Sequence, residues 1–213
     1  MNREILKNLY LLRAMGYKFI DESTISSSKN LTPKSIDELN YEIKNCNLCA
    51  LKNSSKHSIC GFGDTKSKIM FIAFEPTSSD DNSGEFLSGV LGSKLCEMSK
   101  ISLNLNRGEF YFSSILRCKS SQNFSQNEAI LRCKPYIFEE IKIINASVIV
   151  ALGEEVFINL GGQINGSFES VRGSFFKFKN ATLMPTFSLL SVVKNPSLEA
   201  KFLADLEKLK GLI

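Results

Sequence analysis

Four cysteines have the type and spacing of metal ligands. Cys46 and Cys49 form a C-x-x-C motif, and Cys118 and Cys133 form a second, wider pair. Four thiolates from two distant segments can hold a tetrahedral zinc ion or a 4Fe–4S cluster. Zinc modules usually place their two pairs close together in the chain, so the long separation favours an iron–sulfur cluster, with zinc or no metal as the alternatives.

A second candidate for chemistry is the stretch KIMFIAFEPTSSDDNSG, from Lys68 to Gly84. Its apolar first half predicts a strand, and loops at the C-terminal ends of strands carry ligand sites in open α/β folds. Glu75, Asp80 and Asp81 are carboxylates that could act there as acids or bases. The alternative is that the two aspartates only form a polar turn, which is the more common role of such residues.

The elements that must position these residues alternate along the chain after residue 66. Buried-looking strands separated by helical segments predict an α/β fold, with a mostly parallel sheet of four to five strands and helices on both faces. Ligands of such folds bind beyond the C-terminal ends of the strands. We predict strands at 68–74, 109–116, 147–153, 174–178 and 181–187, and helices at 92–101, 127–145, 154–160 and 195–210.

The N-terminal part of the chain is expected to be separate from this domain. Apolar residues recur at helical spacing, so we predict a helical extension over residues 1–22. A polar, turn-rich linker follows over 23–34. The main domain then spans 35–213 and begins with a helix. A capping box at Ser35 and the pair Thr32 and Pro33 are equally good signals for its start. The extension could pack on its own domain or bind a partner protein through residues 1–20.

Composition limits the class of protein. The chain has 213 residues, of which 43% are hydrophobic and 23% charged, the balance of a folded globular protein. No apolar run is long enough to span a membrane and no export signal is recognisable, so we expect a cytoplasmic monomer with reduced thiols. The net charge of +4 permits DNA binding without arguing for it.

The order of these features resembles the family-four uracil-DNA glycosylases, which carry a 4Fe–4S cluster, over residues 35–210. The first family motif is GEAPG, two residues, ED, two more and G. It corresponds to AFEPTSSDDNSG, with matches at Pro76, Asp81 and Gly84. Further matches follow in order at Gly89, Gly92, the RC of 117–118, Cys133, the VALG of 150–153, the RG of 172–173 and the PTF…KNPSL of 185–198.

The resemblance implies a uracil-DNA glycosylase-like fold, a DNA partner and a 4Fe–4S cluster on the four paired cysteines. It also implies a set of substrate-binding positions, which are Ala73, Glu75, Asp81, Leu87, Ser114 and Arg172. DNA contacts would come from basic residues near the edge of the cleft, namely Arg172, Lys177, Lys179 and Lys194. The only histidine, His57, is expected to be a solvent-exposed loop residue.

This sequence departs from the family at the positions that perform the chemistry. Phe74 stands in place of the active-site glutamate, Ser114 in place of the base-reading asparagine, and Ser188 in place of the histidine of the last motif. Leu87 replaces the aromatic residue that stacks on the flipped base. Cleavage of an N-glycosidic bond requires a positioned water and stabilisation of the leaving base, and these side chains supply neither.

Three functions are therefore weighed. The first is a uracil-DNA glycosylase-like iron–sulfur protein related to base-excision DNA repair, with lost or strongly reduced uracil excision. The second is an active DNA glycosylase with altered base preference, in which Glu75 substitutes for the missing glutamate together with Asp80, Asp81 and Ser188. The third is a non-enzymatic module, stabilised by its cluster, that binds DNA or protein.

Overall fold

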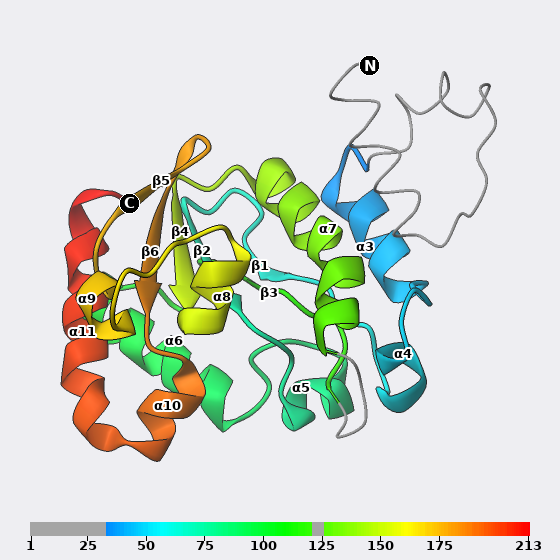
Figure 1. Ribbon diagram of the computed structural model, residues 1–213, viewed down its shortest axis with the longest axis horizontal. Helices are drawn as coiled ribbons and strands as arrows, with labels where there is room; N and C mark the ends of the chain where they lie inside the picture. The colour runs from blue at the N-terminus through cyan, green and yellow to red at the C-terminus, as the bar shows by residue number, and fades with distance from the viewer. Residues whose placement is uncertain (1–32, 121–125) are drawn as a thin grey trace.

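A six-stranded sheet forms the centre of the fold. The computed structural model describes residues 33–120 and 126–213, and its strands lie in the order β1-β3-β2-β4-β6-β5 (Figure 1). The four inner strands run parallel, while the edge strands β1 and β5 run antiparallel to their neighbours. The strands are β1 (Phe62–Gly63), β2 (Ile69–Ala73), β3 (Tyr111–Ser114), β4 (Val148–Leu152), β5 (Phe176–Phe178) and β6 (Ala181–Thr186).

This arrangement confirms the predicted α/β fold and its mostly parallel sheet. All five predicted strands are present, each somewhat shorter than its apolar run. The sixth strand, β1, pairs with β3 through only two residues. A segment of that length is too short to show an alternation of apolar and polar residues, and β1 was therefore not predicted.

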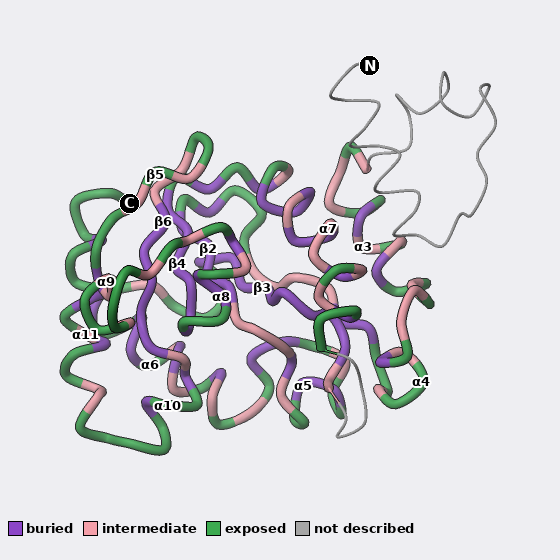
Figure 2. The backbone as a smooth tube through the Cα atoms, in the orientation of Figure 1, coloured by how far each residue is buried: buried purple, intermediate pink, exposed green. Residues whose placement is uncertain are grey.

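Helices cover both faces of the sheet. Successive residues of β2 point to opposite sides, so that Ile69 and Phe71 enter one core and Met70 and Ile72 enter the other. Figure 2 shows the strands buried between helices that expose their outer faces. The first core is covered by α6 (Val90–Leu103), α10 (Leu189–Lys194) and α11 (Glu199–Glu207), and the second by α7 (Gln126–Ile144) and α8 (Glu154–Asn159).

Helices α3 (Ile36–Lys44) and α4 (Leu51–Ser54) form a third packing region beside α7. Ser35 caps α3 as predicted, because its hydroxyl accepts the N–H of Glu38. A small core lies between these helices and the segment that follows β3. Another short helix, α9 (Phe168–Val171), precedes the β5–β6 hairpin.

Two short helices form in segments for which no helix was predicted, and capping explains both. The first is α5 (Ser78–Ser83), which has no apolar face and forms because of its N-terminus. Thr77 Oγ1 accepts the N–H of Asp80, and the Asp80 carboxylate accepts the N–H of Thr77, which makes a capping box. The second is α10, where the Ser188 hydroxyl accepts the N–H of Ser191. Local capping therefore created helices that periodicity could not indicate.

The C-terminal prediction needs a smaller correction. The helix expected over 195–210 is divided into a 3₁₀ turn, Pro196–Leu198, followed by α11 and a second 3₁₀ turn, Lys208–Gly211. The Asn195 side chain starts the first turn by accepting the N–H of Ser197. The predicted extension 1–22 and most of the linker lie outside the described residues. Among the helices that are described, none is long and apolar enough to cross a membrane.

Candidate functional site

A pocket of about 460 Å³ opens where three neighbouring parallel strands end. The end of β2 and the residues after it supply one wall, β4 and the start of α8 supply a second, and the segment after β6 supplies a third. This is the edge at which α/β folds bind ligands. Its lining comprises Ala73, Phe74, Glu75, Pro76, Thr77, Ser78, Asp80, Leu87, Leu91, Gly92, Phe112, Lys119, Leu152, Glu155, Ser188, Leu189 and Leu190.

The structure brings most of the predicted site residues to this pocket. Those that line it are Ala73, Phe74, Glu75, Leu87 and Ser188. Those that do not are Asp81, Ser114 and Arg172. Each of the latter three is held by contacts with the protein itself.

The serines at the two substituted positions use their hydroxyls locally. Ser114 is fully buried, and its hydroxyl donates to the Leu116 carbonyl at 2.5 Å. Ser188 caps α10 and shares a hydrogen bond with the Ser191 hydroxyl at 2.8 Å. At the third position Phe74 presents a ring, which offers no proton acceptor. The three positions therefore contribute little polar chemistry to the pocket.

Glu75 is fixed by the segment after β3. Its carboxylate forms an ion pair with Lys119 Nζ at 2.9 Å and accepts the N–H of Ser120 at 3.1 Å. Both residues come directly after Cys118. Both oxygens of this carboxylate are therefore engaged by groups of the protein.

The carboxylates of Asp80 and Asp81, on α5, are engaged in hydrogen bonds within the protein. Asp80 is buried, and its carboxylate accepts four hydrogen bonds, from the N–H and hydroxyl groups of Thr77 and Ser88. Asp81 accepts the N–H groups of Lys56 and His57. These contacts support the structural alternative for the aspartate pair, although the two residues lie in a helix and not in a turn.

His57 is exposed as expected, but it is not free. Its ring nitrogen Nδ1 lies 2.7 Å from the Asp81 carbonyl. The ring also lies against Gly84, where an added Cβ would stand 3.4 Å from Cδ2. The single imidazole of the chain is therefore attached to the outer side of α5, and it does not line the pocket.

Glu155 is the pocket residue that sequence reasoning missed. It is an exposed residue in the first turn of α8, just after the buried strand β4. Within the described part of the chain, no hydrogen bond or ion pair engages its carboxylate. A glutamate at a helix start is ordinary in sequence, so only the adjacency of β4 to β2 and β6 reveals that it faces a site.

Leu87 enters the pocket through an unusual backbone conformation. Its φ is +64°, in the left-handed region that branched side chains rarely adopt. An added Cβ on Gly92 would stand 2.3 Å from Leu87 Cα, so only glycine lets the start of α6 approach this closely. The adjacent Phe86 is fully buried, with its ring 5.2 Å from that of Phe112 in an edge contact. Phe86 therefore does not replace the missing stacking ring.

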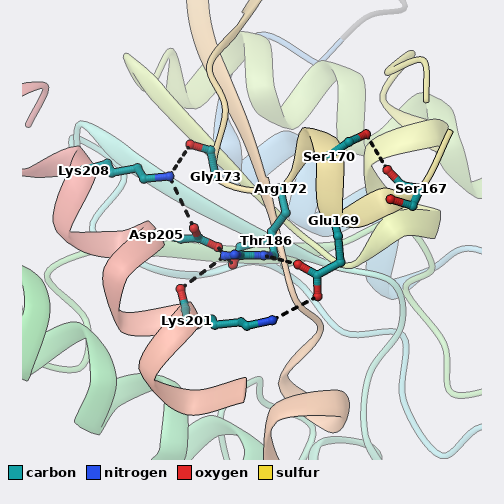
Figure 3. Close-up of polar contacts among 9 residues, drawn as sticks. All are labelled: Ser167, Glu169, Ser170, Arg172, Gly173, Thr186, Lys201, Asp205 and Lys208. Atoms are coloured by element: carbon teal, nitrogen blue, oxygen red, sulfur yellow. Dashed lines mark hydrogen bonds and ion pairs between the residues drawn. The ribbon is translucent and has the colours of Figure 1, made fainter. Parts of the chain in front are cut away.

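Arg172 belongs to a structural network (Figure 3). Its guanidinium donates to the buried carboxylate of Asp205 on α11 and forms an ion pair with Glu169 at 3.3 Å. Asp205 also accepts the hydroxyl of Thr186, at the end of β6, at 2.7 Å. The Arg172 guanidinium carbon lies 4.8 Å from the centre of the Phe187 ring. The network therefore joins α9, β6 and α11 beside the segment that leads to Ser188.

Two of the basic residues expected near the cleft lie elsewhere. Lys177 is on β5 and Lys179 is in the turn between β5 and β6. Because the pocket lies beyond the C-terminal end of β6, this turn is at the opposite end of the sheet (Figure 1). Lys194, at the end of α10, is exposed on the pocket side of the sheet. The prediction for the hairpin lysines was wrong because the sequence did not show their pairing direction.

The four predicted metal ligands converge in the third core. Cys118 and Cys133 are buried there, and Cys46 and Cys49 pack against them. All four are free thiols. Burial, with smaller contributions from the neighbouring Cys118 and Cys46, raises the pKa of Cys133 to about 12, although the nearby Arg117 opposes the shift. Cys96 packs instead against the main core.

The donor set fits an iron–sulfur cluster. The Arg117 N–H donates to Cys133 Sγ at 3.3 Å, and the Ser58 hydroxyl lies 3.4 Å from Cys118 Sγ. Such donors stabilise thiolate ligands. Among the described residues, no three His, Cys, Asp or Glu side chains are placed to hold a single metal ion. Four thiolates are the ligand set of a 4Fe–4S cluster, and Cys46, Cys49, Cys118 and Cys133 supply thiols of that type.

A buried ion pair supports the cysteine region from the sheet side. Arg117 Nη2 lies 2.5 Å from Glu140 on α7, and both side chains are almost fully buried. Tyr111 and Ser113 of β3 also donate to Glu140, at 2.9 and 2.5 Å. Burial, with the added effect of the Glu140 charge, strongly raises the pKa of Tyr111. The network locks β3 to α7, the two elements that lead to Cys118 and carry Cys133.

Comparison with known proteins agrees with this geometry. Residues 60–210 match the uracil DNA glycosylase superfamily. The chain is 28% identical to the type-4 uracil-DNA glycosylase of Saccharolobus solfataricus, over 82% of this chain and 85% of the relative. It is 28% identical to that of Sulfurisphaera tokodaii, over 84% of each, and 26% identical to that of Archaeoglobus fulgidus, over 84% of this chain and 94% of the relative. The predicted resemblance is confirmed, and the chain belongs to the uracil DNA glycosylase superfamily.

Proposed function

We propose that this chain is an iron–sulfur DNA glycosylase-like protein of base-excision repair in which uracil excision is lost or strongly reduced. One observation carries the proposal: the pocket is retained, but it lacks the polar groups that uracil excision requires. Phe74 replaces the carboxylate, and the hydroxyls of Ser114 and Ser188 are bound within the protein. Glu75 is neutralised by Lys119.

The leaving group explains why these losses matter. Uracil departs as an anion, so its departure depends on hydrogen-bond donors that stabilise developing negative charge. Each such group contributes about a hundred- to a thousandfold in rate. A pocket without them is expected to release uracil at least a thousandfold more slowly than one that has them.

DNA is the proposed partner, and the cluster is proposed to be structural. DNA as partner is supported by the relatives, which are uracil-DNA glycosylases, and by the position of the pocket at the carboxyl ends of the strands. Cys46, Cys49, Cys118 and Cys133 would hold the cluster, which would join α3 and α4 to the segments around β3 and α7. Closing loops of this length restricts the unfolded chain. Reduced thiols agree with a cytoplasmic protein, and we propose a monomer with its main domain over 35–213.

The test is a uracil-release assay on anaerobically purified protein, with the Saccharolobus solfataricus relative as the positive control. We expect release at least a thousandfold slower than by the relative, in both single- and double-stranded oligonucleotides. Uracil release within tenfold of the relative would overturn the proposal.

A reversal variant tests the same reasoning from the other side. The triple change Phe74→Glu, Ser114→Asn and Ser188→His restores the side-chain types of the family. It is expected to raise uracil release at least tenfold over the unaltered chain, provided that circular dichroism shows a folded protein. The Phe74→Ala variant opens the same space without a carboxylate and serves as the control, so an equal gain in both variants would count against the reasoning.

A second candidate function, excision of a different base, is favoured by Glu155. This carboxylate lines the pocket and is engaged by no other described residue. It gives the pocket a carboxylate that could act as a general base, at a position that was not predicted from the sequence.

A further inference from the structure

We infer that the pocket accepts a positively charged N-alkylated purine, and that Glu155 is the base that activates water against it. This inference rests on the proposed function, because it assumes that the pocket receives a base flipped out of DNA. It adds the class of base and the residue that acts.

The charge of the pocket favours a cationic ligand over an anionic one. Three carboxylates line it, those of Glu75, Asp80 and Glu155, against the single ammonium group of Lys119. That ammonium is already paired with Glu75. A developing uracil anion would therefore meet net negative charge, whereas a cationic base would be attracted by it.

The apolar lining favours the same ligand. Phe74 and Phe112 present aromatic groups, and half of the other lining side chains are aliphatic. Aromatic rings attract cations, and the attraction strengthens away from water. The volume of about 460 Å³ leaves room for a two-ring base. The buried hydroxyl of Ser114 cannot distinguish the pairing edge of a base, so recognition would depend on charge and shape.

The chemistry of a cationic base removes the need for the missing groups. When the bond between the purine nitrogen and the sugar C1′ breaks, its electron pair returns to the ring and cancels the positive charge. The base therefore leaves neutral, without a donor that stabilises an anion. A water oxygen attacks C1′, and its proton passes to the Glu155 carboxylate and then to solvent. The products are the neutral alkylated base and an abasic sugar.

Glu155 is the lining carboxylate that is available for this step. Glu75 is paired with Lys119, and Asp80 accepts four hydrogen bonds. Among the described residues, none forms a hydrogen bond or ion pair with the Glu155 carboxylate, and Glu155 is an exposed residue in the first turn of α8. A general base of this kind contributes about a hundred- to ten-thousandfold.

The experiment measures release of methylated purines from DNA. Duplexes bearing 7-methylguanine or 3-methyladenine are incubated with the anaerobically purified full chain, and free bases are quantified by mass spectrometry against a protein-free sample, which corrects for spontaneous loss. Matched duplexes bear uracil or no lesion. We expect release of at least one methylated purine at ten times the spontaneous rate or more, and little release of uracil.

Two neighbouring variants identify the acting residue. Glu155→Gln is expected to lower the single-turnover rate at least a hundredfold and to leave binding of the methylated duplex within threefold. Glu154→Gln removes the adjacent exposed carboxylate of α8, which does not line the pocket, and is expected to leave the rate unchanged. Equal thermal midpoints for the two variants would exclude a folding effect.

The outcomes separate the inference from the function on which it rests. Rapid uracil release overturns the proposed function. Slow uracil release without release of either methylated purine overturns the inference and leaves the proposed function standing. Release of methylated purines with equal rates for Glu155→Gln and Glu154→Gln overturns the role of Glu155.

Discussion

Replacement of Asp205 by alanine is expected to destabilise the protein strongly, although the residue lies outside the pocket. Asp205 is 1% exposed and joins three elements through Arg172 and Thr186 (Figure 3). Its removal leaves a partly buried guanidinium without its main partner and a fully buried hydroxyl without its acceptor. Because Thr186 ends β6 and lies two residues before Ser188, loosening of this network would also disturb one wall of the pocket.

The magnitude follows from the contacts that are lost. A hydrogen bond to a charged group contributes about 1.5–3 kcal/mol, and a buried polar group left without a partner costs about 1–3 kcal/mol. Breaking one side of a buried ion pair costs about 3–5 kcal/mol in other proteins. We therefore expect Asp205→Ala to lower the free energy of unfolding by about 3–5 kcal/mol. The further ion pair of Asp205 with Lys208, at 3.6 Å, is half-exposed and adds little to this value.

The assay is urea unfolding of anaerobically prepared protein, followed by circular dichroism and by visible absorbance of the cluster. Coincident transitions would justify a two-state treatment. Glu207→Ala is the matched control, because Glu207 lies on the same helix but forms only an exposed pair with Lys210 at 3.5 Å. Its effect is expected to stay below about 0.5 kcal/mol.

A double-mutant cycle with Thr186→Val tests the mechanism. Valine keeps the shape of threonine without the hydroxyl, so the double variant leaves no orphaned donor at position 186. Asp205→Ala should therefore cost at least about 1 kcal/mol less in the Thr186→Val background than in the unaltered chain. Simple additivity of the two changes, or a cost below about 1 kcal/mol for Asp205→Ala alone, would refute the reasoning.

Three further predictions concern the metal site, the pocket and the buried ion pair. Cys118→Ala is expected to abolish the brown colour and the visible absorbance of the anaerobically purified protein; a colourless, zinc-loaded unaltered protein would contradict the cluster. Gly92→Ala is expected to destabilise the protein by about 1–3 kcal/mol, because the added Cβ would meet the backbone atoms of Leu87. The control is Gly211→Ala, where an added Cβ meets nothing within 4 Å, and it should be nearly neutral when both variants are measured by thermal unfolding. Glu140→Ala is expected to cost about 3–5 kcal/mol, and the double change Arg117→Met with Glu140→Leu much less, by the same urea titration; equal costs would contradict this expectation.

The sequence predicted those parts of the fold that depend on apolar periodicity. The strands at β2 and β4 were found because continuous apolar runs such as that of Val148–Leu152 mark strands buried on both faces. Helix α5 was missed because its stability comes from the capping box of Thr77 and Asp80 and not from an apolar face. Strand β1 was missed because two residues are too few to show a pattern.

The site was predictable where a family motif supplied its residues, as it did for Ala73, Phe74, Glu75, Leu87 and Ser188. Ala73, Phe74 and Glu75 reached the pocket because they follow one strand. Glu155 was not predictable, since its position depends on the spatial order of β2, β4 and β6. Arg172 matched a family position, yet its partner Asp205 lies on a distant helix, and nothing in the sequence links the two.

One short segment connects the cysteine site to the pocket. Lys119 and Ser120, which hold Glu75, follow directly after Cys118. If the proposed cluster is bound there, its loss from Cys118 would free this segment and, with it, one wall of the pocket. Coupling between two sites is reciprocal, so a ligand that orders the pocket must also stabilise the metal-bound form. DNA carrying the right base would then slow the removal of iron by a chelator, and oxidative damage to the cluster would weaken DNA recognition.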